Sequence, residues 1–129
     1  MKLIKLYETK NAGGIGAVVG EVELDRVIDI DPIDLFEETP EIVLHALKRA
    51  GLTQNQFIKY SDWDICKAIY VKNPKRYEKP EKLPEGIRAP QNFCYGPNCI
   101  YLSIHKKWAD KILSGKKDIE IRKKFAANI

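Results

Sequence analysis

The feature that most constrains the fold is a stretch near the amino end in which apolar and acidic side chains alternate. From Ala17 onward, Val18, Val22 and Leu24 fall on one side of an extended chain, and Glu21 and Glu23 fall on the other. Because successive side chains of a strand point to opposite faces, this period of two predicts a strand with one buried and one solvated face. Such a strand needs hydrogen-bonded neighbours, so the chain must build a sheet.

Four further segments predict strands at residues 3–7, 66–71, 99–104 and 118–123, and Asn73-Pro74 is expected to end the strand at 66–71. Residues 32–61 predict a helical insertion, in which Asp31-Pro32 and Thr39-Pro40 open the first two helices. Its apolar stripe, which ends at Gly51, consists of Ile42, Val43, Ala46, Leu47 and Ala50. Thr53 and Gln56 form a capping box for a third helix, and a last helix carries Trp108 and ends at Gly115. We therefore expect one α+β (α/β) domain of five to six strands.

The charges of the 129-residue chain are divided unevenly between its halves. Residues 1–64 carry 7 Lys and Arg against 12 Asp and Glu, whereas residues 65–129 carry 15 against 6. An anionic partner would bind the second half, although a lysine-rich face is often only a solvated surface.

Several classes of protein are excluded by residue usage. Cys66, Cys94 and Cys99 are not spaced as zinc ligands, and His45 and His105 do not complete such a set. We expect no metal, no cofactor and no disulfide framework. The apolar runs are too short to span a membrane and the amino end lacks a signal-peptide pattern, so we expect a cytoplasmic protein with no membrane partner.

The segment 115–122 carries the most informative chemistry. On a strand, Glu120 and Arg122 share one face, where the carboxylate can orient the guanidinium toward a phosphate. Lys117 adds a mobile cation that could act as a base or nucleophile in a dry pocket. The alternative is a solvent-exposed edge strand whose alternating charges discourage aggregation.

Gly115, Lys117, Glu120 and Arg122 form the pattern GxKxxExR after a short helix, and in this the chain resembles the ASCH family. The resemblance extends over nearly the whole chain through residues 7–10, 18–21, 68–71, 77–80, 89–93 and 101–113.

The order of these segments differs from that of the family. Residues 99–129 correspond to the usual amino-terminal part, so the single domain 1–129 reads as a circular permutation. Chain ends that lie close together make permutation physically tolerable. The alternatives are a domain-swapped oligomer, in which Met1 and Ile129 of two molecules complete each other, and an engineered or truncated chain.

The resemblance implies a small PUA-like β-barrel, with short helices at its openings and a cleft for RNA or modified nucleosides. It places Lys117, Glu120 and Arg122 on the cleft wall and Ser103 and Lys106 at the entrance. Tyr7, Thr9 and Lys10 would line the adjacent strand and meet an unstacked base.

For function, the resemblance favours a module that binds RNA or a nucleotide. Some ASCH proteins hydrolyse N4-acetylcytidine with the lysine of this pattern, a threonine three residues later and a glutamate from the helical region. In this chain Lys117 matches the lysine, but Glu120 stands in the place of the threonine. Residues 49–53 supply no matching glutamate. The alternative is therefore a hydrolase of a modified nucleoside or of RNA, in which Lys117 and Glu120 form a different acid and base pair. A third reading is a protein-interaction module whose acidic stretch 25–41 recruits a basic partner.

Overall fold

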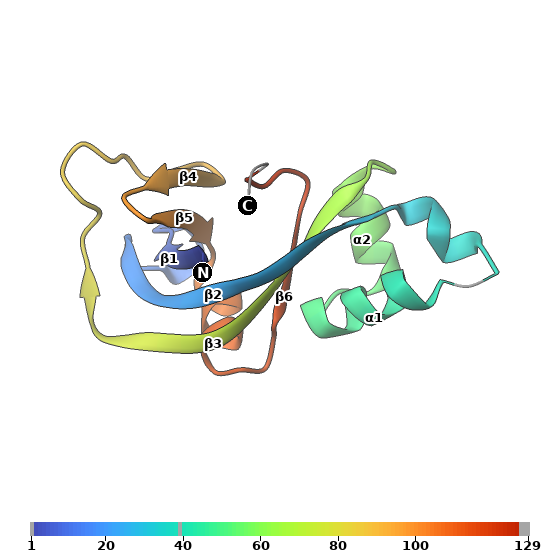
Figure 1. The fold of residues 1–129 in the computed structure, drawn as a ribbon, viewed down its shortest axis with the longest axis horizontal. Coiled ribbons are helices and arrows are strands. Elements are labelled where there is room, and N and C mark those ends of the chain that lie inside the picture. The colour runs from blue at the N-terminus through green and yellow to red at the C-terminus, as the bar shows by residue number, and fades with distance from the viewer. Residues whose placement is uncertain (1, 39, 127–129) are drawn as a thin grey trace.

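The computed structural model describes residues 2–38 and 40–126, which form a curled six-stranded sheet in the order β4-β5-β1-β2-β3-β6 (Figure 1). The strands are β1 (Lys2–Glu8), β2 (Ala17–Ile30), β3 (Cys66–Glu81), β4 (Phe93–Gly96), β5 (Cys99–Ile104) and β6 (Ile119–Arg122). Strands β1 and β5 are parallel, and the other neighbours are antiparallel. The expected α+β class, with a small barrel-like sheet and short helices, is confirmed.

The alternating segment forms the first half of β2, as predicted, with Val18 and Val22 buried. The prediction that the next strand ends at Asn73-Pro74 is wrong, because β3 continues to Glu81. Lys72 pairs with Glu23 and Lys75 with Glu21, so β3 carries one extra residue at this point, and Asn73 has a φ of 51°. A bulge accommodates the proline, which cannot donate to the ladder.

The predicted insertion forms the helices η2 (Pro32–Phe36), α1 (Glu41–Ala50) and α2 (Gln54–Ser61). Asp31 accepts the backbone N–H of Ile33, and the capping box of Thr53 and Gln56 is confirmed. Gly51 ends α1 with a φ of 76°. The predicted cap Thr39 lies outside the described residues.

Residues 31–64, which we call the helical lobe, lie beyond the end of the curled sheet, and β2 and β3 reach into the lobe (Figure 1). The predicted apolar stripe packs with Phe57 into a core of the lobe, except for Ile42, which is 67% exposed on the first turn of α1. The prediction for Ile42 is therefore wrong.

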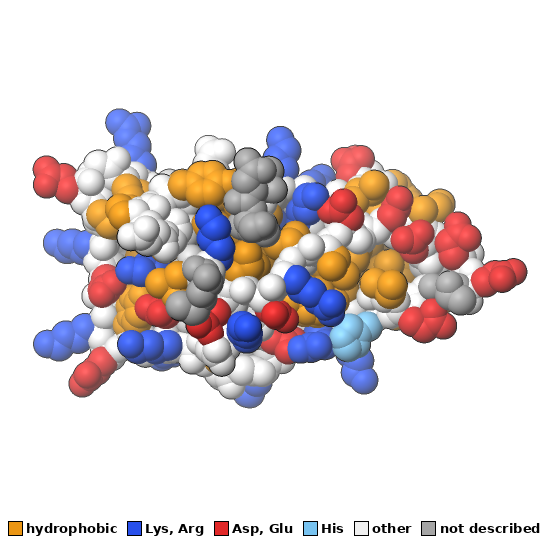
Figure 2. All heavy atoms as spheres, viewed as in Figure 1, with side chains coloured by type: hydrophobic (Ala, Val, Ile, Leu, Met, Phe, Trp, Pro, Cys, Tyr) orange, Lys and Arg blue, Asp and Glu red, His pale blue; other side chains and the backbone are white. Residues whose placement is uncertain are grey.

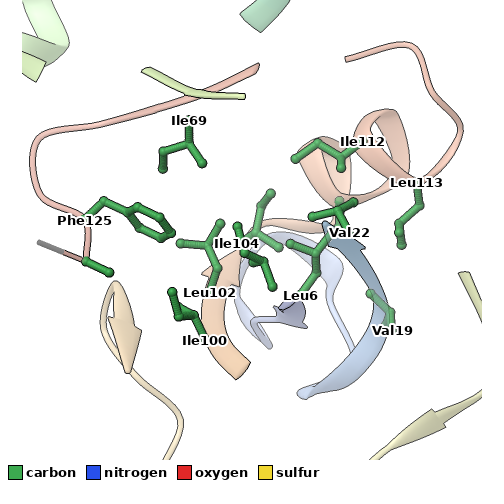
Figure 3. Close-up of a cluster of buried hydrophobic side chains, with 13 residues drawn as sticks. Leu6, Val19, Val22, Ile69, Ile100, Leu102, Ile104, Ile112, Leu113 and Phe125 are labelled. Carbon is green, nitrogen blue, oxygen red and sulfur yellow. The ribbon is translucent and has the colours of Figure 1, made fainter. Parts of the chain in front are cut away.

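The main core fills the inside of the curled sheet, where buried side chains of β1, β2, β3 and β5 converge with those of α3 (Lys106–Leu113) (Figure 3). Helix α3 approaches closely because Gly20 has no side chain. A Cβ atom there would lie 2.6 Å from the carbonyl oxygen of Lys75 and 2.7 Å from Cδ2 of Leu113. Each fully buried side chain such as Ile112 contributes about 1.5–3 kcal/mol.

Lys2 and Ala126, the first and last described residues, line one cavity of about 650 Å³. The predicted neighbours Met1 and Ile129 lie outside the described residues. Within residues 2–38 and 40–126, no helix is long and apolar enough to cross a membrane. The same residues contain no group of three or more His, Cys, Asp or Glu side chains that could hold a metal ion.

Candidate functional site

The candidate site is a cavity of about 370 Å³, which we call the triad cavity, between the start of α3, strand β6 and the lobe helix α2. Its charged residues are Lys117, Glu120 and Arg122, which we call the triad. The remaining lining residues are Thr9, Asn11, Leu52, Tyr60, Gln91, Ser103, Ile104, His105, Trp108 and Ile121.

Glu120 is the centre of the triad. Its side chain, on a residue only 6% exposed, accepts from Lys117 Nζ at 2.7 Å and from Arg122 Nε at 2.7 Å. Burial alone would raise the pKa of Glu120, but the charges of Arg122 and Lys117 outweigh it and hold the pKa below the ordinary glutamate value. Glu120 is thus a carboxylate at neutral pH, and the interpretation as a solvated edge strand is wrong.

Arg122 uses its guanidinium mainly to hold the protein together. Beyond Glu120, Nη1 donates to Asn92 Oδ1 at 2.8 Å and Nη2 donates to the carbonyl of Ser103 at 2.8 Å. Asn92 Nδ2 in turn donates to the carbonyl of Lys124 at 3.0 Å. These bonds join the two ends of the sheet, β6 and the β4–β5 hairpin, which are not neighbours in the sheet order. Since a guanidinium has five N–H donors, two remain for a ligand.

Lys117 enters the cavity from the turn between α3 and β6 and is 5% exposed. Its Nζ lies 4.3 Å from the centroid of the Trp108 ring, a cation–π distance. Gly115 has a φ of 81°, which lets the chain turn back sharply after α3. The backbone N–H of Lys117 then donates to the carbonyl of Lys111 at 3.1 Å. The glycine of the pattern therefore positions its lysine.

Thr9 supplies an unused polar group. Its Oγ1 is the one buried side-chain polar atom among the described residues that has no hydrogen-bond partner. Ser103, by contrast, donates its hydroxyl to the carbonyl of Pro90 at 2.5 Å. An unpaired buried hydroxyl is costly in the protein alone, so a ligand that reached Thr9 Oγ1 would supply the missing hydrogen bond.

Of the eight predicted site residues, the structure brings five to the triad cavity: Thr9, Ser103, Lys117, Glu120 and Arg122. Three do not line it. Tyr7 is buried in a separate cluster with Val18 and Tyr101. Lys106 is exposed and pairs with Asp110 at 2.8 Å, and the exposed stem of Lys10 lies against Gly16.

Sequence reasoning did not assign Trp108, Tyr60, Gln91 or His105 to the site. Trp108 and His105 could have been found, because they flank the start of the helix that leads into the GxKxxExR pattern. No local sequence pattern marks Tyr60 as a site residue, because it reaches the cavity from the helical lobe. Its hydroxyl accepts a hydrogen bond from the backbone N–H of Lys123 at 3.2 Å.

The fold and the cavity define the class: a small α+β protein with a curled half-barrel sheet and a buried Lys-Glu-Arg triad. No protein-family model, no curated protein and no solved structure matches the chain.

Proposed function

We propose that the triad cavity binds one nucleotide unit, either free or within RNA, in an ASCH-like module. The observation that carries the proposal is a cavity lined by the triad and by Thr9, whose buried hydroxyl has no hydrogen-bond partner in the protein. Two cations and one carboxylate give the triad a net charge of +1, which suits a phosphate or another electron-rich group.

The walls of the triad cavity suit a nucleobase. Leu52, Ile104 and Ile121 are apolar, Tyr60 adds an aromatic ring, and Gln91 adds donors and acceptors for the edge of a base. The volume of about 370 Å³ is at the lower end of the range for small-molecule sites, so it suits one nucleoside unit rather than several.

The proposal is tested by calorimetric titration with mononucleotides, nucleosides and short single-stranded RNA. Lys117→Met removes the cavity's free N–H donors on Nζ and its positive charge, and it should weaken binding about ten- to hundredfold. Lys116→Met is the matched control, because Lys116 is exposed and lies outside the cavity. Equal affinity for both variants, or no binding by the wild type, would overturn the proposal.

Thr9→Val is the sharper variant, since it keeps the branched shape and removes only the unpaired hydroxyl. Ligand affinity should fall about threefold to tenfold while the melting temperature stays level or rises, because no protein hydrogen bond is lost. A lower melting temperature with unchanged affinity would show that the hydroxyl serves the fold.

A second candidate is hydrolysis of an acylated nucleoside or of RNA, favoured by the contact of 2.7 Å between Lys117 and Glu120, which both line the cavity beside Thr9. Glu120 is a weak base there, because two cations hold its pKa low. Binding is therefore the leading function. Incubation with N4-acetylcytidine and with single-stranded RNA, beside Lys117→Ala, separates the two: turnover that Lys117→Ala abolishes supports hydrolysis, and no turnover removes it.

A further inference from the structure

A second surface, which shares no residue with the triad cavity, is formed by residues of the helical lobe and by Ile65, which directly follows the lobe. Phe36 and Trp63 are 68% and 51% exposed, and their ring centroids lie 5.9 Å apart. Ile33, three residues before Phe36, and Ile65, two residues after Trp63, are also more than half exposed. We call these four residues the lobe patch. None of them belongs to the buried core of the lobe.

Trp63 is held in a backbone conformation that a tryptophan rarely adopts. The N–H of Asp64 donates to the carbonyl of Ser61 at 3.0 Å, and both central residues of this turn are left-handed, with φ of 51° at Asp62 and 66° at Trp63. Turns of this kind favour Asn-Gly, because a Cβ atom costs about 1–2 kcal/mol in the left-handed region. The fold thus retains an exposed indole at a position where glycine would be better, and such strain is typical of binding sites.

The lobe that carries this patch is rich in negative charge. Residues 31–64 carry the acids Asp31, Asp34, Glu37, Glu38, Glu41, Asp62 and Asp64 against three Lys and Arg. Within the described residues, none of these seven carboxylates forms a salt bridge. In Figure 2, acidic side chains gather around apolar ones at the end of the molecule that the lobe occupies.

From this combination we infer that the lobe patch docks a basic segment of another protein, one in which Lys and Arg side chains alternate with apolar anchors. Exposed aromatic anchors with a charged rim are the composition of a binding hot spot. The acidic rim repels nucleic acids and anionic membranes.

A second copy of this chain is a poor occupant. Outside the lobe and the lobe patch, the exposed large apolar side chains of the described residues are Ile15 and Tyr95. They lie on different parts of the chain, so the basic half of another copy offers no matching pair of apolar anchors. The inference does not depend on the function of the triad cavity.

The test uses a synthetic peptide of about 16 residues, with Lys and Leu at helical spacing, titrated into the full chain and followed by calorimetry. Two control peptides carry Glu in place of Lys, or Ser in place of Leu. The wild type should bind the Lys-Leu peptide and neither control. Phe36→Ala should weaken binding about tenfold, whereas Tyr95→Ala, an exposed aromatic outside the lobe, should change it less than about twofold.

Several results would overturn the inference. These are equal binding of the Glu peptide, equal losses in Phe36→Ala and Tyr95→Ala, or sedimentation showing that Phe36→Ala dissolves a dimer of this chain. Thr9→Val should bind the Lys-Leu peptide as the wild type does. A loss of ligand binding in the triad cavity is thereby distinguished from a loss of peptide binding at the lobe patch.

Trp63→Gly separates docking from folding. Glycine relieves the left-handed strain, so the melting temperature should equal or exceed that of the wild type, and should exceed that of Trp63→Ala by about 2–5 °C. Peptide binding should be lost in both variants. A melting temperature of Trp63→Gly well below the wild type would mean that the indole serves the fold, and the inference would then be wrong.

Discussion

At the scale of single residues, the triad is a buried charge cluster in which each member depends on the others. Glu120→Gln should destabilise the protein by about 3–5 kcal/mol, because it leaves Lys117 and Arg122 without their counter-charge. Urea unfolding at pH 7 measures this loss. Glu78→Gln on the exposed end of β3 is the control and should change stability by less than about 0.5 kcal/mol.

The same residue predicts a pH dependence. The pKa of Glu120 is lower in the folded protein than the value of about 4.3 in an unfolded chain. Glu120 therefore contributes stability that is fully present above pH 4.3 or so and is lost as pH falls through the lower folded pKa. Melting temperatures from pH 7 to pH 2.5 should fall less steeply for Glu120→Gln than for the wild type. Parallel curves would contradict the prediction.

Much of the site could be predicted at this scale, since strand alternation places Glu120 and Arg122 on one face without any tertiary information. The partners of Arg122 could not. Asn92 and Ser103 lie 30 and 19 residues away in sequence, and only the curling of the sheet brings them to the guanidinium. For that reason Arg122 looks like a free phosphate binder in the sequence, whereas most of its donors are used inside the protein.

At the scale of elements, Arg122 and Asn92 connect the two edges of the sheet. Asn92→Ala removes both the acceptor for Nη1 and the donor to Lys124. Hydrogen exchange should speed up in β4 and β6, while the amides of α1 stay protected. The double variant Asn92→Ala/Arg122→Lys should lose less free energy of unfolding than the sum of the two single losses, because both substitutions break the same hydrogen bond. Strict additivity would show that the connection is not a unit.

Helix α3 provides a second prediction, based on two glycines that matter for different reasons. Gly20→Ala puts a methyl group against the carbonyl of Lys75 and should destabilise by about 1–3 kcal/mol, since the backbone of β3 cannot move away. Gly115 has open space around it and a φ of 81°. Gly115→Asn should therefore cost less than Gly115→Val, because asparagine tolerates the left-handed region. Thermal melting ranks the variants, and a milder effect of Gly20→Ala than of Gly115→Asn would contradict this account.

Element starts and stops could be predicted wherever a local signal fixes them, as at Asp31, Thr53 and Gly51. The prediction failed at Asn73-Pro74, where the residues favour a turn but pairing with β2 continues and the strand forms a bulge instead. Such an outcome depends on a partner strand about 50 residues away, so local propensity cannot decide it.

At the scale of the whole molecule, the uneven charge has a structural counterpart: the acidic half contributes the lobe, and the basic half contributes most of the triad cavity. The hypothesis that the chain is a circular permutation is testable, because Lys2 and Ala126, near the two ends of the chain, line a common cavity. Joining the two ends by a flexible linker of about six residues should therefore be tolerated.

The new ends of such a chain belong between Pro97 and Asn98, in the two-residue turn that joins β4 to β5 and where Asn98 has a φ of 59°. Opening this turn breaks no ladder bond, and β4 stays tied to Arg122 through Asn92. The rearranged chain should fold, give the wild-type circular dichroism spectrum and sediment as a monomer. The contrasting variant opens the linked chain between Glu21 and Val22, within the β2–β3 ladder. It should not fold, because the β1–β2 and β2–β3 pairings would then have to form from separate ends of the chain. If both rearranged chains fold equally well, the continuity of β2 is not what orders the sheet.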